Sequence, residues 1–310
     1  STQKIFTNKS NTVVIGLIGY ISNLEALKCF LNFDQKEDVC VLGKLYETKG
    51  KEGFEMLEGL FTVVVHDTSL GKTYLFQDAY GFSMPLIYAS IPEGMVFGTR
   101  LKNLLAEHFP KREFNLAAAR DLLASRTMVP GKNTLLKGIY KLVPEKMLVV
   151  DHENGQIHEE SFKRNLKTVP VEEAKKNLIS SIEKEVTNIS RQVQTRKIAM
   201  PLSSGFDSNL LLHFLHDQFD AITAVTIGGQ KINEIKKAAC CATHYSKVRH
   251  KSFSVQSNRL QKFPEIVWRT EGNVFEVGLF LQYELSQGLT QSGTTIAFLG
   301  DCADQQLKPL

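Results

Sequence analysis

The second part of the chain alternates short apolar runs with amphipathic stretches, and this order constrains the fold more than any other feature. The apolar runs predict strands at 197–202, 222–227, 246–253 and 294–299. The amphipathic stretches between them predict helices at 207–219, at 233–243 and through 287. Strands that alternate with helices build a parallel sheet, so we expect an α/β domain here.

The first 150 residues follow another pattern, in which short runs alternate apolar and polar positions and end at turn residues. They predict strands at 13–21, 60–66, 73–76, 95–97 and 147–150. Helices are predicted between them at 23–32, 39–46 and 116–124. Period-2 strands separated by turns are typical of antiparallel sheets, so this part predicts an α+β domain.

A polar segment at 151–170 separates the two patterns and ends at Pro170. Beyond it, apolar residues recur every three or four positions, which predicts a long helix with one apolar stripe. The stripe comprises Val171, Ala174, Leu178, Ile182, Val186 and Ile189. Because 310 residues exceed the usual size of one core, we predict two domains, 1–165 and 166–310, with the boundary within 162–170.

The composition, 23% charged and 43% hydrophobic, is that of a globular protein. The net charge of +4 is spread thinly, and the lysines of 44–51 are interleaved with acidic residues, so we expect no nucleic-acid binding. Five cysteines without disulfide-framework spacing favour a reducing compartment. The apolar run at 12–21 is too short to span a bilayer. We expect a cytoplasmic protein that does not bind membranes.

Residues 203–208 read SSGFDS and follow the first strand of the predicted parallel sheet, at the edge where such sheets bind ligands. Ser203 and Ser208 offer hydroxyl groups, Gly205 lets the backbone approach a ligand, and the next helix begins with unpaired amides. These features suit phosphate oxygens. Asp207 beside an anion indicates a cation between them, and Mg²⁺ takes both carboxylate and phosphate oxygens. The alternative is that Asp207 caps the helix.

A second candidate segment, GDCADQ at 300–305, follows the last predicted strand. Asp301 and Asp304 lie three residues apart, so one can serve a metal and the other a reacting group. The alternative is a helix N-terminus rich in aspartate. No Walker-type Gly-x-x-x-x-Gly-Lys sequence is present. A few histidines and cysteines could be imagined as a zinc site, but they lie at predicted helical positions and form no Cys-x-x-Cys pair, so we assign none. These residues are His213, His216, Cys240, Cys241 and His244.

Together these segments resemble the asparagine synthetases and β-lactam synthetases. SSGFDS is similar to that family's Ser-Gly-Gly-x-Asp-Ser pyrophosphate loop, and GDCADQ to its second acidic motif. AVTIG at 224–228 resembles the strand whose backbone contacts adenine, and FPEIVW at 263–268 resembles a family helix. Ser204 and Gln305 stand where the family has glycine and glutamate. The resemblance implies an α/β parallel-sheet PP-loop ATP pyrophosphatase domain, with a helical remainder and a catalytic lysine expected beyond Leu310.

The first part resembles the family's glutaminase, a class II amidotransferase-type domain with an Ntn-hydrolase-like sandwich of antiparallel sheets. Similar segments lie at 57–67, 77–89, 97–105 and 129–144. The chain begins Ser1-Thr2-Gln3 without a nearby cysteine nucleophile, and Ile18 stands where the family's oxyanion motif has asparagine. Because isoleucine cannot donate to an oxyanion, we expect a degenerate domain that does not hydrolyse glutamine.

The resemblance implies an ATP-dependent carbon–nitrogen ligase that forms an amide through an acyl-adenylate and releases AMP and pyrophosphate. Asp207 and Asp304 are expected to bind Mg²⁺, and Asp301 to accept or position the amine proton. Nucleotide contacts, largely through the backbone, are expected from Leu202, Ser203, Ser204, Gly205, Asp207, Ser208, Ile227, Leu299 and Gly300.

Loss of the glutaminase implies a carboxylate substrate that meets a substrate amine, as in β-lactam synthetases and lasso-peptide macrolactam cyclases. A precursor peptide and a partner protein from the same biosynthetic cluster are the expected partners. Two other functions stay open. One is asparagine synthesis from free ammonia. The other is non-catalytic binding of a nucleotide or a partner protein, which the departures at Ser204 and Gln305 allow.

Overall fold

The computed structural model describes residues 4–78, 80–81, 85–108, 112–125, 131–161, 169–228, 233–254, 259–271 and 278–300. The chain divides into two compact units, Ser1–Thr168 and Val169–Leu310, each with a hydrophobic core of its own. Across these described ranges, no helix has both the length and the apolar character needed to cross a membrane.

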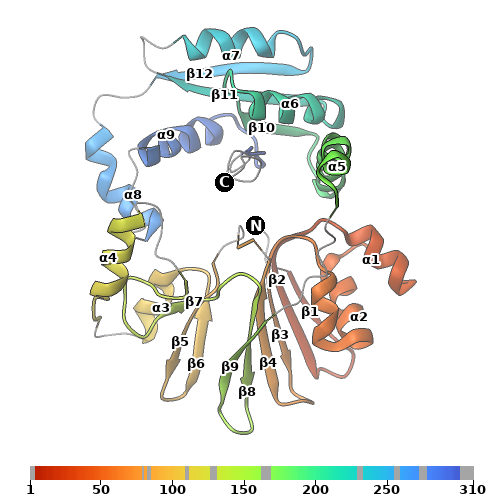
Figure 1. Cartoon of the computed structure of the whole chain (residues 1–310), viewed down its shortest axis with the longest axis vertical. Helices are drawn as coiled ribbons and strands as arrows, with labels where there is room; N and C mark the ends of the chain where they lie inside the picture. The colour runs from red at the N-terminus through yellow and green to blue at the C-terminus, as the bar shows by residue number, and fades with distance from the viewer. Residues whose placement is uncertain are drawn as a thin grey trace. The chain divides into compact units, whose positions relative to one another are not determined.

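The larger sheet of the first unit is antiparallel, in the order β1-β2-β3-β4-β8-β9. Its strands are β1 (Lys4–Thr7), β2 (Val13–Ile21), β3 (Gly59–Asp67), β4 (Lys72–Gln77), β8 (Lys146–Asp151) and β9 (Ile157–Ser161). The helices α1 (Leu24–Leu31) and α2 (Asp38–Lys49), followed by the 3₁₀ turn Gly50–Met56, lie beside this sheet (Figure 1). They share a core with alternate strand residues such as Ile15, Leu17 and Val63. The period-2 pattern thus places one sheet face under these helices.

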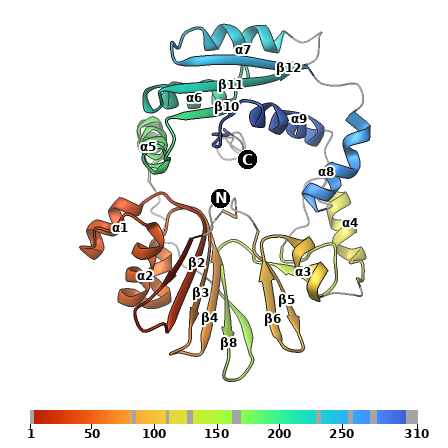
Figure 2. The same ribbon diagram turned by 180° about the vertical axis from the view of Figure 1, so that it is seen from behind.

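A smaller antiparallel sheet, in the order β6-β5-β7, lies on the other side of the larger one. It consists of β5 (Ile87–Ile91), β6 (Gly94–Gly98) and β7 (Tyr140–Lys141). Tyr88 of this sheet packs in one core with Leu75 and Leu148 of the larger sheet. The helix α3 (Leu101–His108) lies beside β5 and β6 (Figure 2), and α4 (Leu116–Ser125) follows it in the chain. The predicted antiparallel α+β architecture is confirmed.

The second unit contains the parallel sheet β10-β11-β12, which confirms the predicted strand and helix alternation. Its elements are α5 (Val171–Gln192), β10 (Lys197–Pro201), α6 (Phe206–Gln218), β11 (Ala221–Gly228), α7 (Glu234–Ala242) and β12 (Val248–Ser254). One face, with Met200 and Ala224, shares a core with α6 and α7. The opposite face is covered by α9 (Gly278–Thr290; Figure 1). There Gly288 lies against Val225 and Phe253.

The strand predicted at 294–299 is wrong in extent. Only Ala297 pairs, in a parallel bridge with Ala199, whose N–H donates to Ile296 and whose carbonyl accepts from Phe298, both at 3.0 Å. The ladder cannot continue beyond Ala199 because Pro201 has no N–H to donate. At its other end, the N–H of Lys197 already donates to Thr195 Oγ1, at 3.1 Å.

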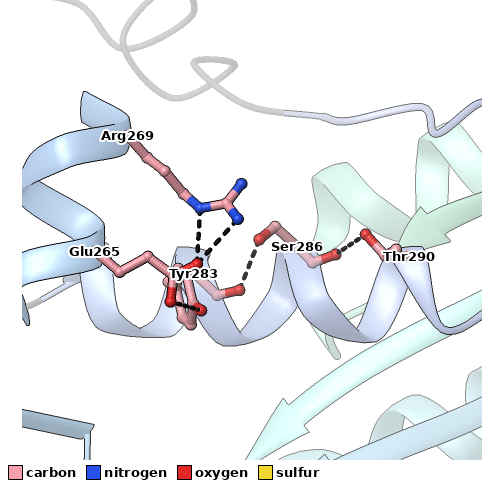
Figure 3. A network of polar contacts seen from close by, with 5 residues as sticks. All are labelled: Glu265, Arg269, Tyr283, Ser286 and Thr290. Carbon is pink, nitrogen blue, oxygen red and sulfur yellow. Dashed lines mark hydrogen bonds and ion pairs between the residues drawn. The ribbon is translucent and has the colours of Figure 1, made fainter. Parts of the chain in front are cut away.

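The helix α8 (Phe263–Thr270), preceded by the 3₁₀ turn Arg259–Lys262, is joined to α9 by a polar network (Figure 3). Tyr283 donates its hydroxyl to Glu265 Oε2 at 2.7 Å, and Arg269 Nε donates to Glu265 Oε1 at 2.9 Å. Hydrogen bonds from Tyr283 and then Arg269 lower the pKa of the Glu265 carboxyl. The rings of Phe263 and Phe280 stack at 6.1 Å beside this network. The FPEIVW segment is therefore a helix fixed to α9.

Candidate functional site

Residues 202–205 connect β10 to α6 at the carboxyl edge of the parallel sheet (Figure 1). Leu202 is buried, and its N–H donates to the Val225 carbonyl at 2.9 Å, whereas residues 203–205 are exposed. The helix begins at Phe206, with Gly205 at the N-cap position. Because glycine has no side chain to cap the helix, the first amides of α6 face the loop as hydrogen-bond donors.

Ser208 and Asn209, in the first turns of α6, hold this loop in shape. The N–H of Ser203 donates to Ser208 Oγ at 3.1 Å, and the two serine hydroxyl oxygens lie 2.9 Å apart. Asn209 Nδ2 donates to the carbonyl oxygens of Ser203 and Gly205, at 3.0 and 2.7 Å. The N–H of Gly205 donates to Ser203 Oγ at 3.1 Å. A ligand would therefore meet a preorganised backbone, which lowers the cost of reorganisation.

Asp207 is the second residue of α6 and is half-buried. The interpretation of Asp207 as the helix cap is wrong, because Gly205 occupies the N-cap position. A carboxylate in the first turn lies close to the positive end of the helix dipole and to the loop. Its role as a magnesium ligand stays a prediction.

The structure brings the second predicted segment to the same sheet edge. Because residues 296–298 run parallel to β10, Leu299 and Gly300 leave the sheet where Leu202 does. A Cβ atom placed on Gly300 would lie 3.9 Å from the carbonyl oxygen of Asp207. Ile227, near the end of β11, lies at this edge too. The described members of the predicted nucleotide set thus share one edge, whereas Asp301 and Asp304 lie outside the described residues.

Glu234, the first residue of α7, contacts the loop and was not predicted from the sequence. Its Oε1 accepts a hydrogen bond from the Ser204 N–H, and its Oε2 accepts one from Ser204 Oγ at 3.0 Å. The predicted alternation of strands and helices indicated where Glu234 would lie. The helix α7 follows β11 as α6 follows β10, so both helix N-termini meet at the same edge.

A hydrogen-bonded chain across the sheet holds the residue that precedes the loop. Thr226 Oγ1 donates to the Leu202 carbonyl at 2.6 Å and lies 2.8 Å from His250 Nε2. Because the single hydroxyl proton goes to Leu202, His250 Nε2 is the donor to Thr226. Burial lowers the pKa of His250, which favours the neutral imidazole. Sequence reasoning missed these hydrogen bonds because Leu202 follows β10, whereas Thr226 lies on β11 and His250 on β12.

In the first unit, Ile18 lines a cavity of about 310 Å³. Most of its other lining side chains are apolar, including Ile5, Leu86 and Phe97. Lys4 also lines the cavity, and its amine forms an ion pair with Asp38 at 2.6 Å. The site where the resemblance places an oxyanion donor therefore has a hydrocarbon side chain.

Two family models match the chain, one to each unit. A glutamine amidotransferase domain matches residues 1–163, and an asparagine synthase domain matches residues 187–307. The fold and these matches define a protein that combines an amidotransferase-type domain with a synthase-type domain. The chain belongs to the asparagine synthetase-like family.

Two curated relatives support this family. Asparagine synthetase [glutamine-hydrolyzing] 2 of Bacillus subtilis (strain 168) is 29% identical over 116 residues, which cover 36% of this chain and 15% of the relative. Asparagine synthetase [glutamine-hydrolyzing] of Zea mays is 36% identical over 101 residues, which cover 31% of this chain and 17% of the relative. The matched part thus spans less than a fifth of either relative.

Two solved NAD synthetases show a partial likeness. The NH3-dependent enzyme from Campylobacter jejuni aligns with a TM-score of 0.29 and 15% identity, over 40% of this chain and 54% of that one. The glutamine-dependent enzyme from Acinetobacter baumannii aligns with a TM-score of 0.30 and 13% identity, over 78% and 57%. TM-scores of this size add nothing to the family assignment.

Proposed function

We propose that the second unit is a PP-loop domain that binds ATP at residues 203–208 and activates a carboxylate for amide formation. The observation that supports this is the meeting of two distant segments, since Gly300 lies beside the Asp207 carbonyl at the carboxyl edge of the parallel sheet. Loops at that edge bind ligands in α/β folds. Backbone donors at a helix N-terminus suit phosphate groups.

Amide formation needs activation because a carboxylate is a poor electrophile at neutral pH. In the proposed reaction, the substrate carboxylate attacks the α-phosphorus of ATP, and pyrophosphate departs into the loop of residues 203–208. An amine then attacks the acyl-adenylate and releases AMP. Much of the rate gain would come from holding carboxylate, nucleotide and amine together.

The loop suits Mg²⁺ through the chemistry of its donors. Asp207 supplies a carboxylate next to the donors that would bind phosphate, and Mg²⁺ typically takes one or two carboxylates together with phosphate oxygens. Within the described residues, no group of three histidine, cysteine or acidic side chains gathers around a possible metal position. From the resemblance of SSGFDS and GDCADQ to the family's two motifs, we assign Asp207 and Asp304 as the ligands and Asp301 to the amine proton. The ion would offset charge on the departing pyrophosphate.

The amine in this proposal belongs to the substrate rather than to glutamine. Ile18 and its largely apolar cavity support this, because the Ntn-hydrolase-like first unit lacks an amide donor at that position. A precursor peptide that is closed into a macrolactam is the proposed substrate, with a partner protein to present it. The described cysteines Cys29, Cys40, Cys240 and Cys241 are free, in keeping with a proposed cytoplasmic location.

Exchange of labelled pyrophosphate into ATP, driven by candidate carboxylates, tests the proposal. Asp207→Asn should reduce exchange by about 100-fold or more, because one magnesium ligand and its charge are lost. Asp217→Asn, in the last turn of the same helix, is the matched control and should leave exchange unchanged. Equal exchange in wild type and Asp207→Asn would contradict the metal assignment.

The identity of the carboxylate that drives exchange separates the candidate functions. Exchange with an acidic peptide supports lactam formation. Exchange with aspartate, followed by asparagine formation from ammonium, supports an ammonia-dependent asparagine synthetase. Nucleotide binding without exchange for any carboxylate supports the non-catalytic alternative.

A further inference from the structure

We propose that Ser204 and Glu234 form a latch that occupies the phosphate loop until the nucleotide displaces the Glu234 carboxylate. The inference rests on the proposed function, because it concerns access to the same loop. It is carried by the two contacts already described, in which one serine supplies both donors and one glutamate supplies both acceptors.

The carboxylate of Glu234 takes a donor that a bound phosphate would need. The Ser204 N–H is a backbone donor of the exposed loop, immediately before Gly205 and the N-terminus of α6. A carboxylate and a phosphate are both anionic acceptors, and one N–H group does not satisfy both at full strength. The negative charges of the phosphate and of the Glu234 carboxylate would also repel each other if both lay beside the Ser204 N–H. Phosphate binding and the Glu234 contact therefore exclude each other.

The serine at position 204 gives the latch its second bond. Ser204 Oγ donates to Glu234 Oε2 at 3.0 Å, a contact that glycine cannot make. The departure from the family's glycine at this position thus has a chemical consequence besides added bulk. Both oxygens of the carboxylate are held, and the loop is closed by a charge-assisted pair.

Glu234 also has a stable alternative once it leaves the loop. It is the first residue of α7, where a carboxylate is favoured by the positive end of its own helix dipole. The side chain is half-buried, whereas Ser204 is exposed to solvent. The latch can therefore open by rotation of one side chain, and the apparent affinity for phosphate is reduced by the fraction of closed molecules.

Calorimetric titration with magnesium pyrophosphate tests the latch. Glu234→Gln should bind magnesium pyrophosphate about tenfold more tightly than wild type. This is the expected effect of removing one charge-assisted hydrogen bond that competes with the ligand. Glu234→Asp keeps the charge at the start of α7 but is one methylene shorter, and it should bind more tightly too. Glu172→Gln, in the first turn of α5, is the matched control and should bind like wild type.

Ser204→Ala provides a second test, because its effect on pyrophosphate affinity should depend on Glu234. The change in affinity that Ser204→Ala causes in the wild type should be absent in the Glu234→Gln background, since the coupling runs through one contact. If wild type binds pyrophosphate and both Glu234 variants bind equally or less tightly, the latch is overturned and the nucleotide site stands. If no variant binds pyrophosphate, the nucleotide site itself is overturned, and the latch with it.

Discussion

At the scale of single residues, Ser208 joins the loop to the helix that follows it. Its hydroxyl oxygen accepts from the Ser203 N–H, and its proton can reach the carbonyl oxygens of Ser203 and Gly205, each at 3.3 Å. Residues 203–206 are exposed, so hydrogen bonds rather than burial hold the loop in shape. Ser208 shares this task with Asn209, which donates to the same two carbonyl oxygens.

Ser208→Ala should weaken binding of magnesium ATP by about tenfold, because the loop loses a contact that preorganises its donors. Thermal stability of the second unit should change little, since the loop is solvent-exposed. Ser286→Ala, which removes an exposed hydroxyl from α9, is the control. Unchanged ATP affinity in Ser208→Ala would show that the loop holds its shape without Ser208.

In the first unit, Tyr46 and Asp67 form a buried polar pair. The Tyr46 hydroxyl donates to Asp67 Oδ2 at 2.8 Å, while Asp67 Oδ1 accepts from the N–H groups of Ser69 and Leu70, at 2.9 and 3.1 Å. Burial alone would raise the pKa of Asp67, but hydrogen bonds from Ser69 and Tyr46 outweigh it and lower the pKa below its ordinary value of 3.8.

Tyr46→Phe should therefore lower the free energy of unfolding of the first unit by about 1.5 to 3 kcal/mol, the typical worth of a hydrogen bond to a charged group. Since folding lowers the Asp67 pKa, its contribution is present above pH 3.8 and is lost as pH falls through the folded value. Urea unfolding at neutral and acidic pH measures both effects. The stability lost in Tyr46→Phe should be smaller at the acidic pH, and an equal loss at both would contradict this linkage.

What the sequence reveals at this scale depends on how far apart the partners lie. The hydrogen-bond donors of residues 203–208 are neighbours in the chain, so the sequence alone indicates that they can bind a phosphate. Glu234 lies on another helix and His250 on another strand, and their contacts form only when the sheet is assembled. The predicted helix begins at Asp207 and the observed one at Phe206, and the alternative that Asp207 caps the helix can be rejected only from the observed N-cap at Gly205.

At the scale of elements, hydrogen bonds between strands fix the base of the loop. Thr226 on β11 bonds to the Leu202 carbonyl beyond β10, and His250 on β12 bonds to Thr226. Thr226→Val keeps the shape and removes both contacts. It should cost about 1 to 3 kcal/mol, because a buried carbonyl and a part-buried imidazole each lose a partner.

Urea unfolding checks this cost, with Thr223→Val as the control, because Thr223 is a half-buried residue of the same strand. A loss in Thr226→Val no larger than that in Thr223→Val would contradict the assigned chain. Magnesium ATP should also bind less tightly to Thr226→Val, since the residue before the loop is held less firmly.

The same chain gives the second unit a pH dependence. Burial lowers the pKa of His250 below its ordinary value of 6.5, so the unfolded state binds the proton more readily than the folded state. The contribution of His250 to stability should be constant above pH 6.5 and should fall as pH decreases from there toward the folded pKa. His250→Gln, which can still donate to Thr226, should flatten this slope, whereas His244→Gln at an exposed position should not.

The elements themselves were largely predictable, because periods of 2.0 and 3.6 residues report which face is buried. The segment at 294–299 shows the limit of that reasoning. Its composition is that of a strand, but pairing needs a partner strand with free N–H donors. Pro201 has no N–H group and the N–H of Lys197 is already bonded, so Ala199 is the one residue of β10 that pairs with this segment. The hydrophobic pattern of a segment does not show whether the neighbouring strand has free N–H groups to pair with it.

At the scale of the whole molecule, two cores suggest two cooperative units. One core is built from β1–β4, β8, α1 and α2, and the other from β10, β11 and the helices α5, α6 and α7. The residues proposed to bind the nucleotide all belong to the second unit. A ligand that binds the native state of one unit stabilises that unit alone, by about 2.7 kcal/mol at 100 times its Kd.

Calorimetric unfolding of the whole chain should therefore show two transitions, and magnesium pyrophosphate should raise the Tm of one of them. Tyr46→Phe should lower the other Tm and leave the ligand-sensitive transition in place, because its lost hydrogen bond lies in the first core. Thr226→Val should lower the ligand-sensitive Tm instead. If both substitutions lowered a single transition together, the two units would unfold as one, and the loop would be coupled energetically to the amidotransferase-type domain.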